Sequence, residues 1–172
     1  MDLPEQRQRV TVDGLGNIGQ GKWKITAKQT GGKFVVGSLE WNENRIEKAT
    51  KTYDAIREAD DVDIVAKNSG MTFQEIQTIK KHIFYDTHIK YDGKIERLDA
   101  DFDMAVAWKR LVAGNPKKRD ILLLKHELLE SQIEKEYTMT IADAHAKAKE
   151  VYPWDEILFE ELGEGGEPDD LL

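Results

Sequence analysis

The sequence contains no cysteine. This absence excludes thiolate metal sites, thiol nucleophiles and disulfide bonds, so any chemistry must use oxygen and imidazole groups. No uninterrupted apolar run approaches the roughly 20 residues that a membrane-spanning helix needs, and Met1–Pro4 does not open a basic and apolar leader. We therefore expect a soluble chain without a membrane span or a signal peptide, located in the cytoplasm of a producing or a target cell.

At 172 residues the chain is long enough for one domain of ordinary size, whereas two enzymatic domains would need more. Hydrophobic residues make up 40% of the sequence and 13 glycines add to them, which is the composition of globular proteins. The composition therefore excludes global disorder and predicts a sizeable core.

The net charge of −8 is concentrated near the C-terminal end of the sequence. Residues 155–172 hold eight of the 33 acidic residues and none of the 25 lysines and arginines, so residues 1–154 are electrically balanced. Acidic blocks of this kind are more often solvated than catalytic, and Gly163–Asp170 has the composition of a disordered segment. We expect an acidic tail that is either solvated or bound to the basic surface of a partner.

The hydrophobic pattern divides the chain into a β part and a helical part. Residues 9–40 alternate like β-strands, with Gly31 and Gly32 permitting a hairpin turn before 34–36. The period then changes from two to about 3.6, which predicts helices near 46–59, 61–68, 72–84, 102–113, 119–137 and 140–152, with a loop or small hairpin at 85–100. The prediction is an α+β fold: a small N-terminal β-hairpin region (1–41), a mainly helical body in the same domain (42–154) and an acidic tail (155–172).

A glycine pattern of the dinucleotide-binding type occurs at Gly14, Gly16 and Gly19, with Glu40 about 20 residues downstream. In such sites the third glycine opens a helix whose N-terminal amides hold the pyrophosphate. Here the residues that follow, 20–26, alternate like a strand instead. We therefore interpret the glycines as a turn and expect no dinucleotide cofactor.

Residues 62–81 have the spacing of a helix-turn-helix, in which Gly70 turns the chain and Thr72 forms a capping box with Glu75. The exposed face of the second helix would carry side chains able to contact bases and phosphates: Gln74, Gln77, Thr78, Lys80 and Lys81. However, the aspartates at 60–63 would repel a polyanion. A helical corner is predicted, and its use as a DNA-binding module stays open as an alternative function.

Two of the four histidines, His126 and His145, lie on apolar helical stripes, and both should be largely buried. Glu130 follows His126 by one helical turn. Buried imidazoles need polar partners, so we expect Glu130 to be the polar partner of these histidines. The cluster could be an acid–base or substrate-binding site, a metal site or a buried structural pair.

The segment from His126 to Glu130 is similar to the helix of zinc peptidases, in which two ligands four residues apart share a face and an adjacent Glu, here Glu127, is the general base. His126, Glu130 and His145 would be the ligands. If residues 138–139 turn a simple antiparallel hairpin, His145 lies opposite residue 132, about 6 Å from the level of such a metal. This offset favours a Glu130–His145 pair over zinc, unless the two helices cross steeply.

The segment 81–103 adds His82 and His88, followed by Asp99, Asp101 and Asp103. The two histidines could act as general acid and base in metal-free phosphodiester cleavage, because histidine titrates near neutral pH. The aspartates could instead bind a divalent cation, although the glycine and distal Glu of a calcium loop are missing. The simplest interpretation makes Asp101 or Asp103 the N-cap of the following helix.

A series of spaced residues between about 62 and 154 resembles the C-terminal toxin domains of bacterial polymorphic and phage-borne toxins. The residues that carry the resemblance are Ala66–Gly70, Ile79–Phe84, Asp101–Ala105, Ala107, Trp108, Leu122–Glu127, Glu130, Ala144, His145, Val151 and Tyr152. Such domains are commonly hydrolases, often nucleases, delivered at the end of a larger secreted protein and neutralised by an immunity protein. The β region and the acidic tail lie outside the resemblance.

The resemblance implies a toxin-type hydrolase, delivered by upstream modules, that acts on nucleic acid in preference to protein. The candidate catalytic cluster is His82, His88, His126, Glu127, Glu130 and His145. A DNA-binding module, a zinc-dependent peptidase-like toxin and a non-catalytic adaptor are the alternatives. The expected partners are an immunity protein and a nucleic acid substrate, and no membrane binding is expected. The sequence decides neither whether a divalent metal is bound nor the oligomeric state.

Overall fold

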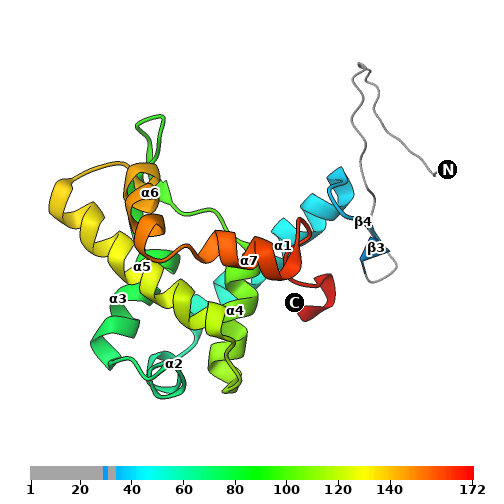
Figure 1. Ribbon diagram of the computed structural model, residues 1–172, viewed down its shortest axis with the longest axis horizontal. Coiled ribbons are helices and arrows are strands. Elements are labelled where there is room, and N and C mark those ends of the chain that lie inside the picture. The colour runs from blue at the N-terminus through cyan, green and yellow to red at the C-terminus, as the bar shows by residue number, and fades with distance from the viewer. Residues whose placement is uncertain (1–28, 31–33) are drawn as a thin grey trace.

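The computed structural model describes residues 29–30 and 34–172, and it has a mainly helical α+β fold (Figure 1). The helices are α1 (Leu39–Glu58), α2 (Val62–Ser69), α3 (Phe73–Phe84), α4 (Phe102–Ala113), α5 (Lys118–Tyr137), α6 (Ile141–Val151) and α7 (Trp154–Leu162), followed by a 3-10 turn at Asp169–Leu171. Within these described ranges, no helix has the length and apolar character needed to cross a membrane.

Two short antiparallel hairpins accompany the helices. Strand β3 (Gln29–Thr30) pairs with β4 (Phe34–Val35), and β5 (Thr87–Ile89) pairs with β6 (Ile95–Arg97). The pairing of β3 with β4 confirms the predicted hairpin, and at 85–100, where a loop or a small hairpin was predicted, the structure has the hairpin. The strands predicted before residue 28 and the dinucleotide-type glycines lie outside the described residues.

Polar caps explain where the helices begin. Ser38, Thr72, Asp101 and Thr140 each accept a hydrogen bond from the backbone N–H three residues on, which satisfies a donor that the helix itself leaves free. Thr72 forms the predicted capping box, and Gly70 ends α2 in the left-handed conformation at φ 77°. The helical corner at 62–84 and the capping role of Asp101 are therefore confirmed.

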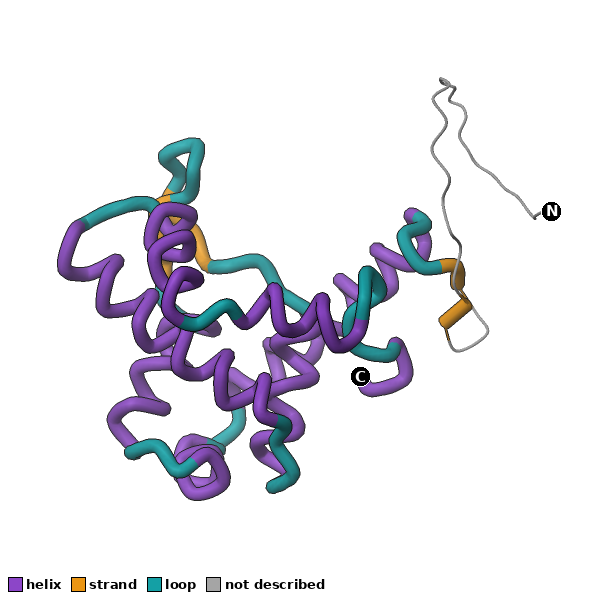
Figure 2. The backbone as a smooth tube through the Cα atoms, viewed as in Figure 1, coloured by secondary structure: helices purple, strands orange, loops and turns teal. Residues whose placement is uncertain are grey.

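Helix α5 lies among the others and packs against α3, α4, α6 and α7 (Figure 2). The main core is built by α1 to α5 around three aromatic rings, Tyr53, Phe84 and Trp108, which meet edge to face at centroid distances of 4.6 and 5.2 Å. Edge-to-face contacts of this kind add to the stabilisation from apolar burial. The core therefore fixes α3 and α5 side by side, which positions the polar side chains described below.

Lys80 is buried, and the expectation that it lies on the exposed face of α3 is wrong. Its Nζ donates to Asp61 Oδ1 at 2.6 Å and to the Ala59 carbonyl at 2.7 Å, and Asp61 also accepts from Trp108 Nε1 at 2.9 Å. The helical corner brings the lysine against the aspartate that precedes α2. The proposed DNA-binding face therefore lacks the Lys80 cation and is left with Gln74, Gln77, Thr78 and Lys81.

Replacing Lys80 with Met should destabilise the fold by about 3 kcal/mol, because Asp61 would remain buried without its cation. Lys81→Met is the matched control, since the Lys81 side chain is 61% exposed, and it should change the unfolding free energy by less than about 0.5 kcal/mol. Urea unfolding of the two variants measures the difference. Equal stabilities would show that Lys80 is free to meet a ligand.

The acidic tail is structured, and the expectation of disorder in Gly163–Asp170 is wrong. Residues 154–162 form helix α7, which the sequence did not predict, and the chain then crosses α4 and α1. Glu167 and Asp169 are only 2% and 9% exposed. The tail is thus part of the folded body.

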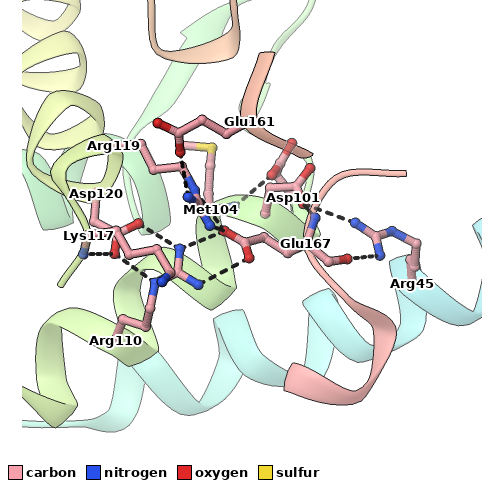
Figure 3. A network of polar contacts seen from close by, with 10 residues as sticks. Arg45, Asp101, Met104, Arg110, Lys117, Arg119, Asp120, Glu161 and Glu167 are labelled. Atoms are coloured by element: carbon pink, nitrogen blue, oxygen red, sulfur yellow. Dashed lines mark hydrogen bonds and ion pairs between the residues drawn. The ribbon is translucent and has the colours of Figure 1, made fainter. Parts of the chain in front are cut away.

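Buried ion pairs hold the tail in place (Figure 3). The Glu167 carboxylate accepts from Arg110 at 2.6 Å and from Arg119 at 2.9 Å, and Asp169 accepts from Arg45 at 2.7 Å. Burial would raise the pKa of Glu167, but the hydrogen bonds from the two guanidinium groups hold it below its ordinary value. The charges of the tail therefore neutralise arginines of the helical body.

Candidate functional site

One face of α5 carries four polar side chains at helical spacing: His126, Glu127, Glu130 and Glu134. The first three are 1%, 4% and 3% exposed. Their hydrogen-bond and ion-pair partners come from α3, β5 and α6. Where the sequence predicts an apolar stripe around His126, the structure has a buried and mostly charged face.

Three donor atoms converge between α5 and α6. His126 Nε2 lies 3.0 Å from His145 Nδ1, and both lie close to Glu130 Oε2, at 3.5 and 3.1 Å. The other ring nitrogen of His126 lies 2.9 Å from the Tyr152 carbonyl at the end of α6. Because a carbonyl oxygen can only accept, His126 Nδ1 donates to it, which leaves His126 Nε2 facing Glu130 and His145.

These distances fit a tetrahedral metal site. Donors about 2.1 Å from a zinc ion lie about 3.4 Å from one another, and the three observed distances bracket this value. A hydrogen bond from the outer nitrogen of a ligand histidine to a carbonyl, as at His126, is the usual support of such a ligand. His126, Glu130 and His145 can therefore hold a divalent cation.

The sequence-based argument against this grouping is wrong. It assumed that the two helices lie antiparallel, which would leave His145 about one turn away from a metal at His126. In the structure Thr138 ends α5 in the left-handed conformation at φ 47°, and α6 crosses α5 at an angle (Figure 1). The crossing brings His145 level with His126. His145 is also half-exposed, with 42% of its side chain accessible, where burial was expected.

Glu130 lies at the centre of the cluster. Its Oε2 faces His126 and His145, and its Oε1 accepts from His82 Nε2 of α3 at 2.8 Å. Burial would raise the pKa of Glu130, but the hydrogen bonds from these three histidines outweigh it and hold the pKa well below the ordinary value. The group is therefore an ionised carboxylate that links α3, α5 and α6.

Glu127 is the second buried carboxyl of the cluster. Its Oε1 lies 4.0 Å from His126 Nε2, and its Oε2 finds no hydrogen-bond partner among the described residues. Burial raises the pKa of Glu127 well above the ordinary value, and the negative charge of Glu130 raises it further. His82 Nε2 lies 3.7 Å from Glu127 Oε2, too far for a hydrogen bond. A buried carboxyl oxygen that accepts no hydrogen bond is costly to folding, and groups of this kind are typical of functional sites.

His82 and His88 do not contact His126 or His145. They meet each other edge to face, with ring centroids 4.7 Å apart, and both face Glu134 on the next turn of α5. The predicted cluster is therefore two groups of side chains, connected by the hydrogen bond between His82 and Glu130. A sequence search for carboxylates on the same stripe as His126 and Glu130 would have found Glu134, which the prediction missed.

The cluster reaches the surface beside α7. His145 Nε2 lies 3.8 Å from Asp155 Oδ2, and Lys149 pairs with Asp155 at 2.9 Å. Asp155 and Lys149 line a surface depression of about 380 Å³ together with Glu156, Phe159 and Glu160. The half-exposed His145 therefore lies next to this depression, through its contact with Asp155.

The aspartates of the 81–103 segment do not form a cation site together. Asp101 caps α4, Asp103 accepts from Arg45 and from the Glu167 backbone N–H, and Asp99 is 98% exposed next to Lys90. The residues proposed for DNA contact lie elsewhere, on α3. Gln74, Gln77 and Lys81 are exposed and Thr78 is half-buried there.

Comparison of the chain with protein-family models, curated proteins and solved structures finds no match. The function must therefore be argued from the geometry of the site.

Proposed function

We propose that the chain is a metal-dependent hydrolase of the toxin type, whose cation is bound by His126, Glu130 and His145. The observation that carries the proposal is the convergence of three donor atoms within 3.5 Å, next to the buried Glu127 carboxyl, one oxygen of which accepts no hydrogen bond. Two imidazoles and one carboxylate are the protein ligands of many catalytic zinc sites, which keep a fourth position for water.

Each residue has a distinct role in this proposal. A bound divalent cation would make its water acidic enough to yield a nucleophile near neutral pH. Glu127 would accept the proton, because burial and the neighbouring Glu130 raise its pKa and make its carboxylate a stronger base than an ordinary one. His82 keeps Glu130 in place through Oε1, and the Tyr152 carbonyl keeps His126 in its ligand tautomer.

The surroundings of the site favour a peptide over a nucleic acid as the substrate. The depression outside His145 is lined by Asp155, Glu156 and Glu160, with Lys149 as its one basic residue. An acidic rim repels a phosphate backbone and attracts neutral or basic chains. The resemblance to toxin domains adds that the substrate belongs to a target cell and that an immunity protein neutralises the activity.

Expression in a bacterial host tests the proposal. The wild-type chain should stop growth, and His126→Ala should relieve the arrest, because it removes a ligand of the cation. Lys125→Ala is the matched control on the same helix, since Lys125 is exposed, and it should remain toxic. If His126→Ala stops growth as strongly as the wild-type chain does, the cluster has no role in the toxicity.

Purified protein then tells the substrates apart. The wild-type chain with one equivalent of zinc should cleave an unfolded protein, and a chelator should stop the cleavage by removing the cation. RNA and duplex DNA are incubated under the same conditions. Cleavage of nucleic acid alone would overturn the peptide assignment, and cleavage that persists with the chelator would overturn the metal.

A further inference from the structure

The second group of side chains, His82 of α3, His88 of β5 and Glu134 of α5, has the composition of a metal site of its own. His88 Nδ1 lies 2.8 Å from Glu134 Oε2, and His82 Nδ1 lies 3.7 Å from Glu134 Oε1. These distances lie on either side of the roughly 3.4 Å expected between donors on a tetrahedral zinc ion. The two histidines are 1% and 2% exposed, and the Glu134 side chain is 15% exposed.

The outer nitrogens of both histidines are bonded to acceptors. His88 Nε2 lies 2.9 Å from the His82 carbonyl oxygen, and His82 Nε2 lies 2.8 Å from Glu130 Oε1. Carbonyl and carboxylate oxygens accept, so each Nε2 donates, which leaves each Nδ1 facing Glu134 as the nitrogen that would bind a cation. Metal-binding histidines are held in the same way, by a hydrogen bond from the nitrogen that does not bind the metal.

We propose that His82 Nδ1, His88 Nδ1 and the Glu134 carboxylate bind a second divalent cation. Two imidazole nitrogens and one carboxylate select zinc or a similar transition metal over magnesium and calcium, which prefer oxygen ligands alone. The two sites share no donor atom, because Glu130 offers Oε2 to the first cation and Oε1 to His82. The second site therefore does not depend on the proposed function of the first.

The position of the site indicates a structural role. Its ligands come from α3, from the strand β5 that follows it and from α5, so one cation ties this consecutive pair of elements to a helix whose ligand lies 46 residues after His88. The two histidines are buried and Glu134 is mostly so. The alternative to a bound metal is an ion pair between a protonated His88 and the Glu134 carboxylate. A metal count distinguishes the two.

Cobalt binding to the full chain tests the site. Protein freed of metal by a chelator is titrated with Co²⁺, which reports tetrahedral coordination by its visible absorption, and bound metal is counted after dialysis. The wild-type chain should bind two equivalents, and His88→Gln and Glu134→Gln should each bind one. Glu136→Gln is the matched control, because Glu136 is exposed on the same helix, and it should still bind two.

The variants also separate this proposal from the first one. His126→Ala should lose one equivalent and keep the cation at His82, His88 and Glu134. If His88→Gln fails to fold, Glu134→Gln decides, since Glu134 is the least buried of the three ligands. The second site is refuted if Glu134→Gln and the wild-type chain bind the same amount of cobalt, whereas the first is refuted if His126→Ala and the wild-type chain do so.

Discussion

Deleting residues 163–172 should unfold the protein at physiological temperature. The deletion removes Glu167 and Asp169, two buried carboxylates that pair with Arg45, Arg110 and Arg119, and leaves each arginine with one other acidic partner. Removing one partner of a buried ion pair costs about 3 to 5 kcal/mol, and a domain has about 5 to 15 kcal/mol of stability in total. The loss should therefore be comparable to the whole stability of the fold, and circular dichroism against urea concentration measures it.

Single substitutions check that buried pairing causes this loss. Glu167→Gln removes the carboxylate that Arg110 and Arg119 share, leaving Arg110 only with Asp120 and Arg119 only with the half-exposed Glu161, and should lower the unfolding free energy by about 3 kcal/mol. Glu164→Gln and Asp170→Asn remove exposed acids from the same segment and should cost less than about 0.5 kcal/mol each. If all three variants and the deletion matched the wild-type stability, the tail would be a solvated segment after all.

Glu127→Gln should lower the hydrolytic rate by about a hundredfold to ten-thousandfold, the contribution of a general base. The amide keeps the shape of the side chain but cannot accept the proton of a bound water. The fold should not suffer, because the carboxyl oxygen has no hydrogen-bond partner among the described residues and an amide is easier to bury than an ion. Activity and stability should thus change in opposite directions.

The pH dependence of stability gives this variant a second readout. The folded-state pKa of Glu127 lies well above its ordinary value of 4.5, so ionisation opposes folding, and stability is lost as the pH rises through the folded value. Measured with chelator present, Glu127→Gln should therefore gain stability relative to the wild-type chain between pH 5 and pH 8. A variant that is inactive and also less stable throughout this range would make Glu127 a structural residue.

Most of the helical body could be predicted because its signals are local. The apolar period of about 3.6 and the caps at Thr72, Asp101 and Thr140 mark helix limits that the structure places within a few residues. The same applies to the pairing of β3 with β4, which alternation predicts, and to the hairpin of β5 and β6, whose turn contains Asp92-Gly93. Local patterns also singled out His126, Glu127 and Glu130, which lie within one and a half helical turns.

The remaining features depend on contacts between distant residues. Composition alone makes Glu167 look solvated, since its partners Arg110 and Arg119 lie 57 and 48 residues away. In the same way, the sequence pattern places Lys80 on an exposed face, because its contact with Asp61 forms only when α2 packs against α3. The crossing of α5 and α6, which decides whether His145 reaches His126, is set by how the helices pack and leaves no periodic signal in the sequence.

The pairing of Arg45 with Asp169 also has a consequence for synthesis of the chain on the ribosome. The two residues are 124 positions apart, a stretch that takes about 6 to 25 s to translate at about 5 to 20 residues per second. Asp103, the other carboxylate that pairs with Arg45, is made earlier, and so are all the proposed metal ligands, the last of which is His145. We expect the nascent chain to stay loosely folded until Asp169 leaves the ribosome, which would delay the proposed hydrolytic activity in the cell that makes it.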